Sequence, residues 1–201
     1  MKTALILLAA GLSRRFGPED KLLLELEGRP LYRHTLDKLE QLRDEDTRLL
    51  VMTNTPAIQA WCGGRGIPWG ASPRAAEGIS HTIRAALALA GEADSYVFFV
   101  SDQPRLREST IGRLLECCRG SGAPLGCLSC GGRRGNPAWF SARFRPELEA
   151  LSGDTGGRAV LQRHLEEAVL VPAAPEELED IDLPLVTGEN LQYNRGRKTS
   201  E

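Results

Sequence analysis

TALILLAAG, residues 3–11, is the stretch of this sequence that decides its fold. From Thr3 to Leu8 the run lacks the alternation of polar and apolar residues that marks a strand with one face in water. We therefore predict a strand buried on both faces, which is typical of a parallel sheet covered by helices. The run is too short to cross a membrane, and Arg14 and Arg15 follow it too soon for a secretory signal.

Helix and strand patterns alternate along the next part of the chain. Apolar residues at helical spacing predict a helix from Leu31 to Arg43, a second behind Ser80 as its cap, and a third around residues 111–118. Apolar runs predict strands over residues 48–53 and 96–100. This order predicts an α/β fold with right-handed βαβ units: a Rossmann-like, doubly wound, mostly parallel sheet in a single domain. Such sheets bind ligands beyond the carboxyl ends of their strands.

The last third of the chain departs from this alternation. It holds a glycine-rich segment over residues 131–136, a short apolar PAWF, a predicted helix over 158–168 and an apolar VLVP over 169–172. We interpret this part as an insertion that builds the far wall of the ligand cleft. We expect one domain over residues 1–190 and a polar, disordered tail over residues 191–201.

Charge and composition limit the class of protein. The chain has 25 Lys plus Arg against 27 Asp plus Glu, so its net charge of −2 provides no overall positive field for nucleic acid. Its three tryptophans are scattered rather than set among basic residues, which argues against a platform for stacked bases. No apolar run reaches the length of a membrane span. We therefore expect a soluble, cytoplasmic protein with no nucleic-acid or membrane partner.

The cysteines and histidines are expected to be ordinary packed residues. Five cysteines are an odd number in a chain too long to need a disulfide scaffold. An adjacent cysteine pair precedes a CxxC motif, which does not match the two knuckles of a usual zinc site. Buried or bystander thiols are therefore favoured over structural zinc. His34 and His164 fall on predicted helices, and no nucleophile-elbow GxSxG accompanies them.

The loop after the first predicted strand carries cations suited to phosphate. Gly11 and Gly17 do not have the spacing of a dinucleotide fingerprint or of a P-loop. In a longer loop, Arg15 offers a two-pronged fork for phosphate oxygens and Lys21 adds a point charge. The loop therefore suits a nucleoside triphosphate, and a solvated connection is the alternative.

Asp102 follows the second fully apolar run, YVFFV, and is expected to face the same cleft. A carboxylate there suits Mg²⁺, which prefers one or two carboxylates and fills its shell with water and substrate phosphates. The alternative is a turn aspartate before Pro104. The cationic loop and the strand-end acid together favour the metal role.

Six motifs carry a resemblance to a known family. They are LAAGLSRRFGPEDKLLLELEGRPL at 8–31, EGISHTIRAAL at 77–87, SDQPRL at 101–106, GRRGNPAWF at 132–140, SGDTGGRAVL at 152–161 and DIDLP at 180–184. In kind and order they resemble those of the nucleotidyltransferases of the molybdenum-cofactor family. The resemblance runs from Thr3 to about Pro184.

This resemblance implies a fold similar to that of nucleotide-diphospho-sugar transferases and a specific reaction. CMP would pass from CTP to the terminal phosphate of molybdopterin, with Mg²⁺ present and pyrophosphate released. LAAG, DQP and GNP look like the cytidylyltransferase branch, because the guanylyltransferase loop usually reads LAGG. Two alternatives stay open: a nucleotidyltransferase that uses GTP or another small phosphorylated acceptor, and a non-catalytic carrier of the cofactor. A molybdoenzyme or its chaperone is a further candidate partner.

The resemblance also assigns roles to individual residues. Arg15 and Lys21 would hold the triphosphate and Asp102 the metal, with Asp182 as a candidate second ligand. The nucleotide would contact Leu8, Ala9, Ala10, Gly11, Gly78 and Ser80, and the acceptor would contact Gly135 and Asn136.

Several residues leave alternatives open. DIDLP lacks the threonine and the acidic residue of a DIDTPED ending, so Asp182 could equally be a turn residue. Ser101 replaces the family's usual glycine before DQP. Arg133 and Arg134 could bind the acceptor phosphate or be solvated. Asp154 could be no more than a helix cap.

Overall fold

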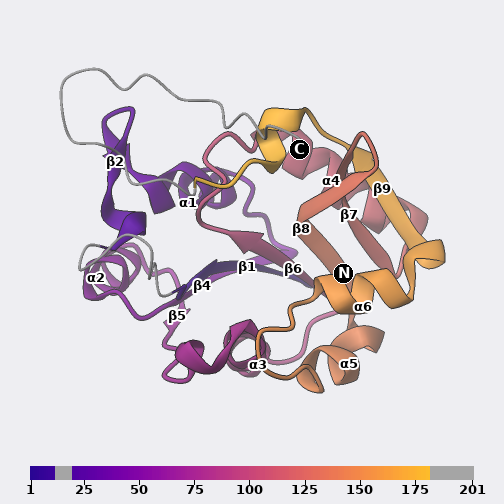
Figure 1. The fold of residues 1–201 in the computed structure, drawn as a ribbon, viewed down its shortest axis with the longest axis horizontal. Helices are drawn as coiled ribbons and strands as arrows, with labels where there is room; N and C mark the ends of the chain where they lie inside the picture. Colours follow the sequence, from indigo (N-terminus) through magenta and orange to yellow (C-terminus); the bar gives the residue numbers. More distant parts are fainter. Residues whose placement is uncertain (12–19, 182–201) are drawn as a thin grey trace, which may run out of the picture.

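A computed structural model describes residues 1–11 and 20–181 of the chain. These residues form a seven-stranded sheet in the order β5-β4-β1-β6-β8-β7-β9, with helices on both faces (Figure 1). The strands are β1 Thr3–Ala9, β4 Thr47–Thr53, β5 Trp69–Gly70, β6 Ser95–Val100, β7 Leu125–Cys130, β8 Arg133–Ser141 and β9 Ala168–Pro172. The helices are α1 Leu31–Gln41, α2 Pro56–Gly64, α3 Ile79–Ala90, α4 Glu108–Ser121, α5 Arg145–Glu149 and α6 Arg158–Arg163. A two-stranded hairpin joins β2 Glu25–Leu26 and β3 Arg29–Pro30. Short 3₁₀ turns are η2 Lys21–Leu23, η3 Ala75–Glu77, η4 Ala142–Phe144, η5 Leu165–Glu167 and η6 Pro175–Leu178.

The sheet is mostly parallel, as predicted. β1 pairs in parallel with both β4 and β6, β4 with β5, and β7 with β9. β8 alone runs antiparallel, between β6 and β7. The doubly wound α/β prediction is confirmed, and the inserted antiparallel strand falls in the part of the chain where the sequence alternation stops.

Two apolar cores, one on each side of the sheet, explain why β1 has no polar face. Leu5 and Leu7 pack into the core that holds the buried residues of α1, α2 and α4. Ala4 and Ile6 pack into the core that holds those of α3, α5 and α6. In Figure 1 α1 and α4 lie above the sheet, and α3 and α5 lie below it. Six of the seven residues of the strand are therefore buried, whichever face of the sheet their side chains point to.

The structure adds one element that was not predicted and corrects two local predictions. The glycine-rich segment is a hairpin, because Gly131 and Gly132 have positive φ values of 55° and 80° and β8 begins directly after them. The helix predicted over 158–168 ends at Arg163, because His164 has left the helical region and the chain must reach β9 at Ala168. Ser80 does not cap α3: it lies within the first turn, and Gly78 holds the cap position.

Three predictions concern residues outside the described part of the chain. These are the roles of Arg15 and Asp182 and the disorder of the tail over residues 191–201. Among residues 1–11 and 20–181, no helix has both the length and the apolar composition needed to cross a bilayer.

Candidate active site

The carboxyl ends of β1 and β6 form one edge of the sheet. Leu8 lies opposite Val100 in the parallel register, so the turns that follow the two strands start side by side. The buried Ser101 donates its hydroxyl hydrogen to the Leu8 carbonyl at 2.7 Å, which ties the two turns together. Ser101 stands where the family usually has glycine. Its hydroxyl therefore stabilises the turn that begins after β6 and carries Asp102.

Lys21 and Asp102 meet at this edge. Lys21 is in η2, whose cap residue Asp20 accepts a hydrogen bond from the Leu22 backbone N–H. The Lys21 residue is only 8% exposed, and its Nζ donates to Asp102 Oδ2 at 2.8 Å and to the Ile181 carbonyl at 2.8 Å. The predicted cation and the predicted metal carboxylate are thus adjacent, although 81 positions separate them.

The end of the described chain crosses the same place. The Ile181 backbone N–H donates to the Asp102 carbonyl at 2.9 Å, and Gln103 Nε2 donates to Asp180 Oδ1 at 2.8 Å. Three residues before Ile181, the Leu178 carbonyl accepts a hydrogen bond from Arg133 Nη2 at 2.7 Å. The segment from Leu178 to Ile181 therefore connects the β7–β8 hairpin to Asp102.

The Asp102 carboxylate suits a hard divalent cation. Its side chain is 25% exposed, so it can reach solvent and substrate. Lys21 occupies Oδ2, whereas Oδ1 accepts no hydrogen bond from residues 1–11 or 20–181. Mg²⁺ needs few protein ligands, since water and phosphate oxygens complete its shell. Asp102 would hold such an ion, which would supply positive charge to the phosphates.

Helix α1 supports the turn that carries Asp102. Thr35 Oγ1 donates to the Gln103 carbonyl at 3.3 Å, and Lys38 Nζ donates to the carbonyls of Pro104 and Leu106 at 2.8 and 2.6 Å. Burial lowers the pKa of Lys38, with its neighbour Arg29 adding to the effect. Sequence reasoning missed this support. The only signal in the sequence was that Thr35 and Lys38, two polar residues three positions apart, lie beside the apolar stripe of the predicted helix.

The amino end of α3 is in close backbone contact with the loop before α6. Gly78 has φ +123°, and a methyl group on it would lie 2.1 Å from the carbonyl carbon and oxygen of Gly153. The Ser80 backbone N–H donates to the Gly153 carbonyl at 3.3 Å. Ser80 itself is 0% exposed, and its hydroxyl has no hydrogen-bond partner in the described part of the chain. Gly78 and Ser80 thus lie where two distant loops cross, with one buried polar group unsatisfied.

Gly135 and Asn136 lie on the strand that flanks β6. The register of β7 against β8 jumps from Cys127–Ala138 to Leu128–Gly135, so Asn136 and Pro137 form a bulge. The Asn136–Pro137 peptide bond is cis. A methyl group on Gly135 would meet Leu178 at 3.0 Å, so this glycine lets η6 pack against the strand. The Asn136 side chain makes no hydrogen bond with any described residue and is half-buried.

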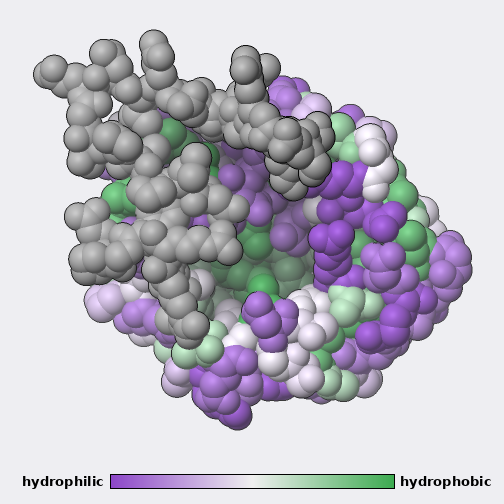
Figure 2. All heavy atoms as spheres, in the orientation of Figure 1, coloured by the Kyte–Doolittle hydropathy of each residue, from purple (hydrophilic) through white to green (hydrophobic). Residues whose placement is uncertain are grey.

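The face of the molecule shown in Figure 2 is hollowed near its centre. The floor of the hollow is largely apolar, and strongly hydrophilic residues stand along one side of it, over β8 as placed in Figure 1. A hollow with an apolar floor and one polar wall suits a ligand with a ring system and a charged group.

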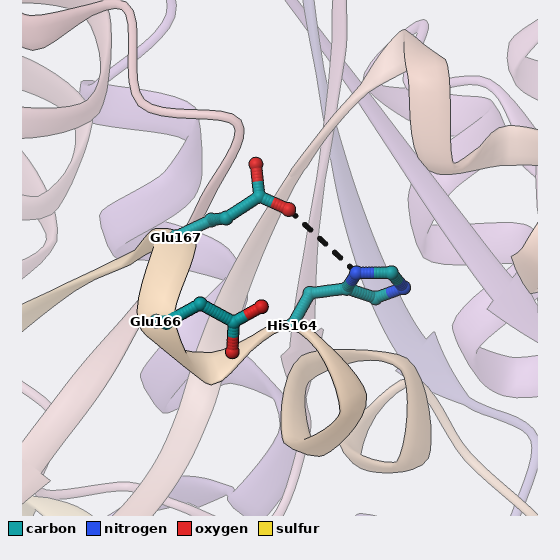
Figure 3. Close-up of side chains that lie close together, drawn as sticks. All are labelled: His164, Glu166 and Glu167. Atoms are coloured by element: carbon teal, nitrogen blue, oxygen red, sulfur yellow. Dashed lines mark ion pairs between the residues drawn. The ribbon is translucent and has the colours of Figure 1, made fainter.

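A second group of potential metal ligands lies after α6. His164, Glu166 and Glu167 bring ligand atoms within 4.8 Å of one another, and Glu167 points toward the His164 ring (Figure 3). Two of the three groups are already engaged, because His164 contacts Glu147 at 2.9 Å and Glu167 pairs with Arg143. This arrangement is a surface charge network, and we assign it no metal.

Three of the five cysteines are buried, whereas Cys117 is exposed and Cys130 half-buried. The cysteines are free thiols, and burial raises the pKa to about 11 for Cys62, about 12 for Cys118 and about 11 for Cys127. His34 is buried on α1, and desolvation lowers its pKa although its ring bonds the Leu26 carbonyl at 2.8 Å. His164 is half-buried against Phe144, at the end of α6 rather than within it. The three buried thiols therefore lack the thiolate character that a nucleophile needs.

The mostly parallel sheet, with Lys21 and Asp102 in contact at the carboxyl ends of β1 and β6, fits the class of α/β nucleotidyltransferases. The chain belongs to the family described as MobA-like NTP transferase domain, whose model matches residues 5–169. Solved structures share the fold. A nucleotidyl transferase from Methanothermobacter thermautotroptrophicus aligns with TM-score 0.72 and 19% identity, over 90% of this chain and 92% of that one. The Rv0371c homolog from Mycobacterium sp. strain JC1 aligns with TM-score 0.73 and 22% identity over the same shares.

Relatives in sequence have more than one name. A nicotine blue oxidoreductase of Paenarthrobacter nicotinovorans is 28% identical over 88% of this chain and 90% of its own length. A probable molybdenum cofactor guanylyltransferase of Pyrococcus horikoshii is 58% identical, over only 20% of this chain and 21% of its own length. A molybdenum cofactor guanylyltransferase of Shewanella putrefaciens is 27% identical over 63% and 62%. The two guanylyltransferase names support the molybdenum-cofactor resemblance at the level of the family.

Proposed function

We propose that this protein transfers CMP from CTP to the terminal phosphate of a molybdopterin-type acceptor, with Mg²⁺ present and pyrophosphate released. The observation that carries the proposal is the contact of Lys21 with Asp102 at the carboxyl ends of β1 and β6. A cation and a metal-binding carboxylate at that edge are what a triphosphate site in this fold requires.

The reaction needs no nucleophile from the protein. An oxygen of the acceptor phosphate attacks the α-phosphorus of the nucleotide; that P–O bond forms as the bond to the β-phosphate oxygen breaks, and pyrophosphate carries the electron pair away. The protein aligns the two phosphates and neutralises their charge. Lys21 does so from η2, and we expect Arg15, which lies outside the described residues, to do so from the preceding loop.

Base choice rests on the turn after β1. Ala10 is buried, 5% exposed, and stands where the guanylyltransferase loop usually has glycine. Its methyl group takes space beside the base, which favours a pyrimidine over the larger purine. GTP is the second candidate, because two relatives are named guanylyltransferases.

Calorimetric titration with CTP, GTP, ATP and UTP tests the proposal, with Mg²⁺ and then with EDTA. We expect CTP to bind best and only with the metal, and pyrophosphate to appear when molybdopterin is added. Ala10→Gly should move the preference toward GTP. Preference for GTP in the parent protein would overturn the base assignment. Binding of molybdopterin without pyrophosphate release would replace the enzyme with a carrier.

Two further parts of the proposal concern the cell rather than the reaction. We propose a cytoplasmic location, where free thiols such as those of the five cysteines persist. We also propose that a molybdoenzyme or its chaperone receives the product. Copurification of a molybdoenzyme with the tagged protein from cells making the cofactor would test the second part.

A further inference from the structure

Two arginines lie where β8 and α6 approach each other. Arg134 extends from β8, and its Nη2 lies 3.5 Å from Gln162 Oε1 on α6. Arg158 is the first residue of the same helix, four positions before Gln162. Residues four apart share one face of a helix, so Arg158 and Arg134 approach the same strip of α6.

Neither arginine is neutralised by an acid. In the described part of the chain Arg134 contacts no carboxylate within 4.0 Å, and Arg158 makes neither an ion pair nor a hydrogen bond. Other arginines nearby are paired: Arg163, also on α6, contacts Glu147 at 2.7 Å, and Arg143 contacts Glu167. The positive charge of Arg134 and Arg158 is therefore available to an anion.

The two arginines lie toward the carboxyl end of β6, where Lys21 contacts Asp102. The last residue of β6 that pairs with β8 is Phe98, opposite Ala138, and β8 begins five residues earlier, at Arg133. Because the strands are antiparallel, Asn136 lies level with Val100 at the end of β6, and Arg134 extends past it, toward the turn that holds Asp102. The strongly hydrophilic side of the hollow in Figure 2 lies over this part of β8.

The loop before α6 packs against the amino end of α3, where we expect the nucleotide. Arg158 follows the loop whose Gly153 accepts a bond from the Ser80 backbone and leaves no room for a side chain at Gly78. The distance between the two loops is thus set by backbone contact. A ligand group held by Arg158 would keep a defined position relative to a nucleotide at Ser80.

We propose that Arg134 and Arg158 form the subsite for the phosphate monoester of the acceptor, with Asn136 beside it. The inference rests on the proposed function and adds the residues that recognise the second substrate. Two guanidinium forks match the oxygens of one phosphate in planar, charge-assisted hydrogen bonds. The nucleotide phosphates have separate cations at Lys21 and in the loop before it, so the two substrates do not compete for one set of charges.

The test uses Arg134→Gln, Arg158→Gln, the double variant and Arg163→Gln as the matched control. The probe is a pterin with a phosphate monoester on its side chain, titrated by calorimetry, with pyrophosphate and CTP plus Mg²⁺ as separate arms. We expect each single change to weaken binding of the probe by about tenfold and the double change by more. Arg163→Gln should change it less than about twofold, because Arg163 already has a carboxylate partner. Arg158→Lys should recover part of the affinity, since it keeps the charge.

Each result has a distinct meaning. Unchanged binding of the probe in the double variant would overturn the subsite. Equal weakening of CTP or pyrophosphate would also overturn it, because the arginines would then serve the nucleotide. If the parent protein binds the probe through these arginines yet releases no pyrophosphate, the proposed function fails and the anion subsite stands.

Discussion

Lys21 places its ammonium nitrogen 2.8 Å from a carboxylate oxygen of Asp102, and the same nitrogen donates to the Ile181 carbonyl. Lys21 is buried, whereas Asp102 faces partly outward. The pair is both a structural contact and the centre of the proposed site, so its two uses must be separated.

Asp102→Asn removes the negative charge and keeps the shape. We expect turnover to fall by at least about a hundredfold, since a metal would lose its protein ligand. The free energy of unfolding should fall by about 1–3 kcal/mol, because the buried Lys21 loses a charged partner. Pyrophosphate release and urea unfolding measure the two effects. Unchanged turnover would rule out a metal role for Asp102.

Lys21→Met provides the companion experiment. Combined with Asp102→Asn, we expect it to destabilise the fold by less than the sum of the two single changes, because the partners touch. A coupling energy of about 1 kcal/mol in urea unfolding would fit a buried ion pair. Strict additivity would show that the 2.8 Å contact contributes nothing to stability.

Ser80→Ala should separate stability from binding. Its hydroxyl is buried without a partner, so its removal should leave the free energy of unfolding unchanged or raise it by up to about 1 kcal/mol. Nucleotide affinity should fall by about fivefold, since a bound nucleotide would displace the atoms that cover this hydroxyl and supply the missing partner. Thr82→Val is the control, because Thr82 already bonds Ser72 at 2.9 Å. A loss of stability without a loss of affinity in Ser80→Ala would contradict the assignment.

Gly78→Ala should damage the crossing of the two loops. The new methyl group would overlap the Gly153 carbonyl, at a φ that L-residues rarely adopt. We expect a loss of about 3 kcal/mol or more in the free energy of unfolding. Gly153→Ala is the matched control: its φ of +54° is also positive, but no atom lies within 4 Å of the added carbon. It should lose only about 1 kcal/mol, the strain of a left-handed alanine. Similar losses in the two variants would mean that the close contact is relieved elsewhere.

Glu177 should make stability fall in acid. It is buried in η6, and burial would raise its pKa. Hydrogen bonds from the Ala174 N–H, Thr110 and the Arg107 N–H outweigh that effect and lower the pKa. The unfolded chain therefore takes up the proton first, and the stabilisation is present above the ordinary glutamate value and lost as the pH falls through the folded value.

Urea unfolding from pH 7 to pH 3 measures this contribution. Glu177→Gln should cost about 1–3 kcal/mol at pH 7 and flatten the fall in acid. Glu176→Gln, at an exposed neighbour, should leave the pH profile unchanged. An identical profile in Glu177→Gln and the parent protein would contradict the lowered pKa.

The sequence by itself determined the class of fold and the two main chemical groups of the site. A run without polar residues can be stable only where both faces are covered, so TALILL predicts an interior strand of a parallel sheet. The edge at which Gly11 and Asp102 lie follows from the same rule, because parallel strands end on one side. These inferences need only local patterns.

Tertiary structure decided which residues touch. The contact of Lys21 with Asp102, the crossing of Gly78 with Gly153 and the approach of Arg134 to α6 join residues far apart in sequence. No local pattern encodes these distances. The strand after Gly132 and the early end of α6 were missed for the same reason: pairing with β6 and β7, and the reach to β9, outweigh local propensity. Periodicity along the sequence indicates which residues are buried, whereas a site depends on which side chains the folded sheet brings within bonding distance.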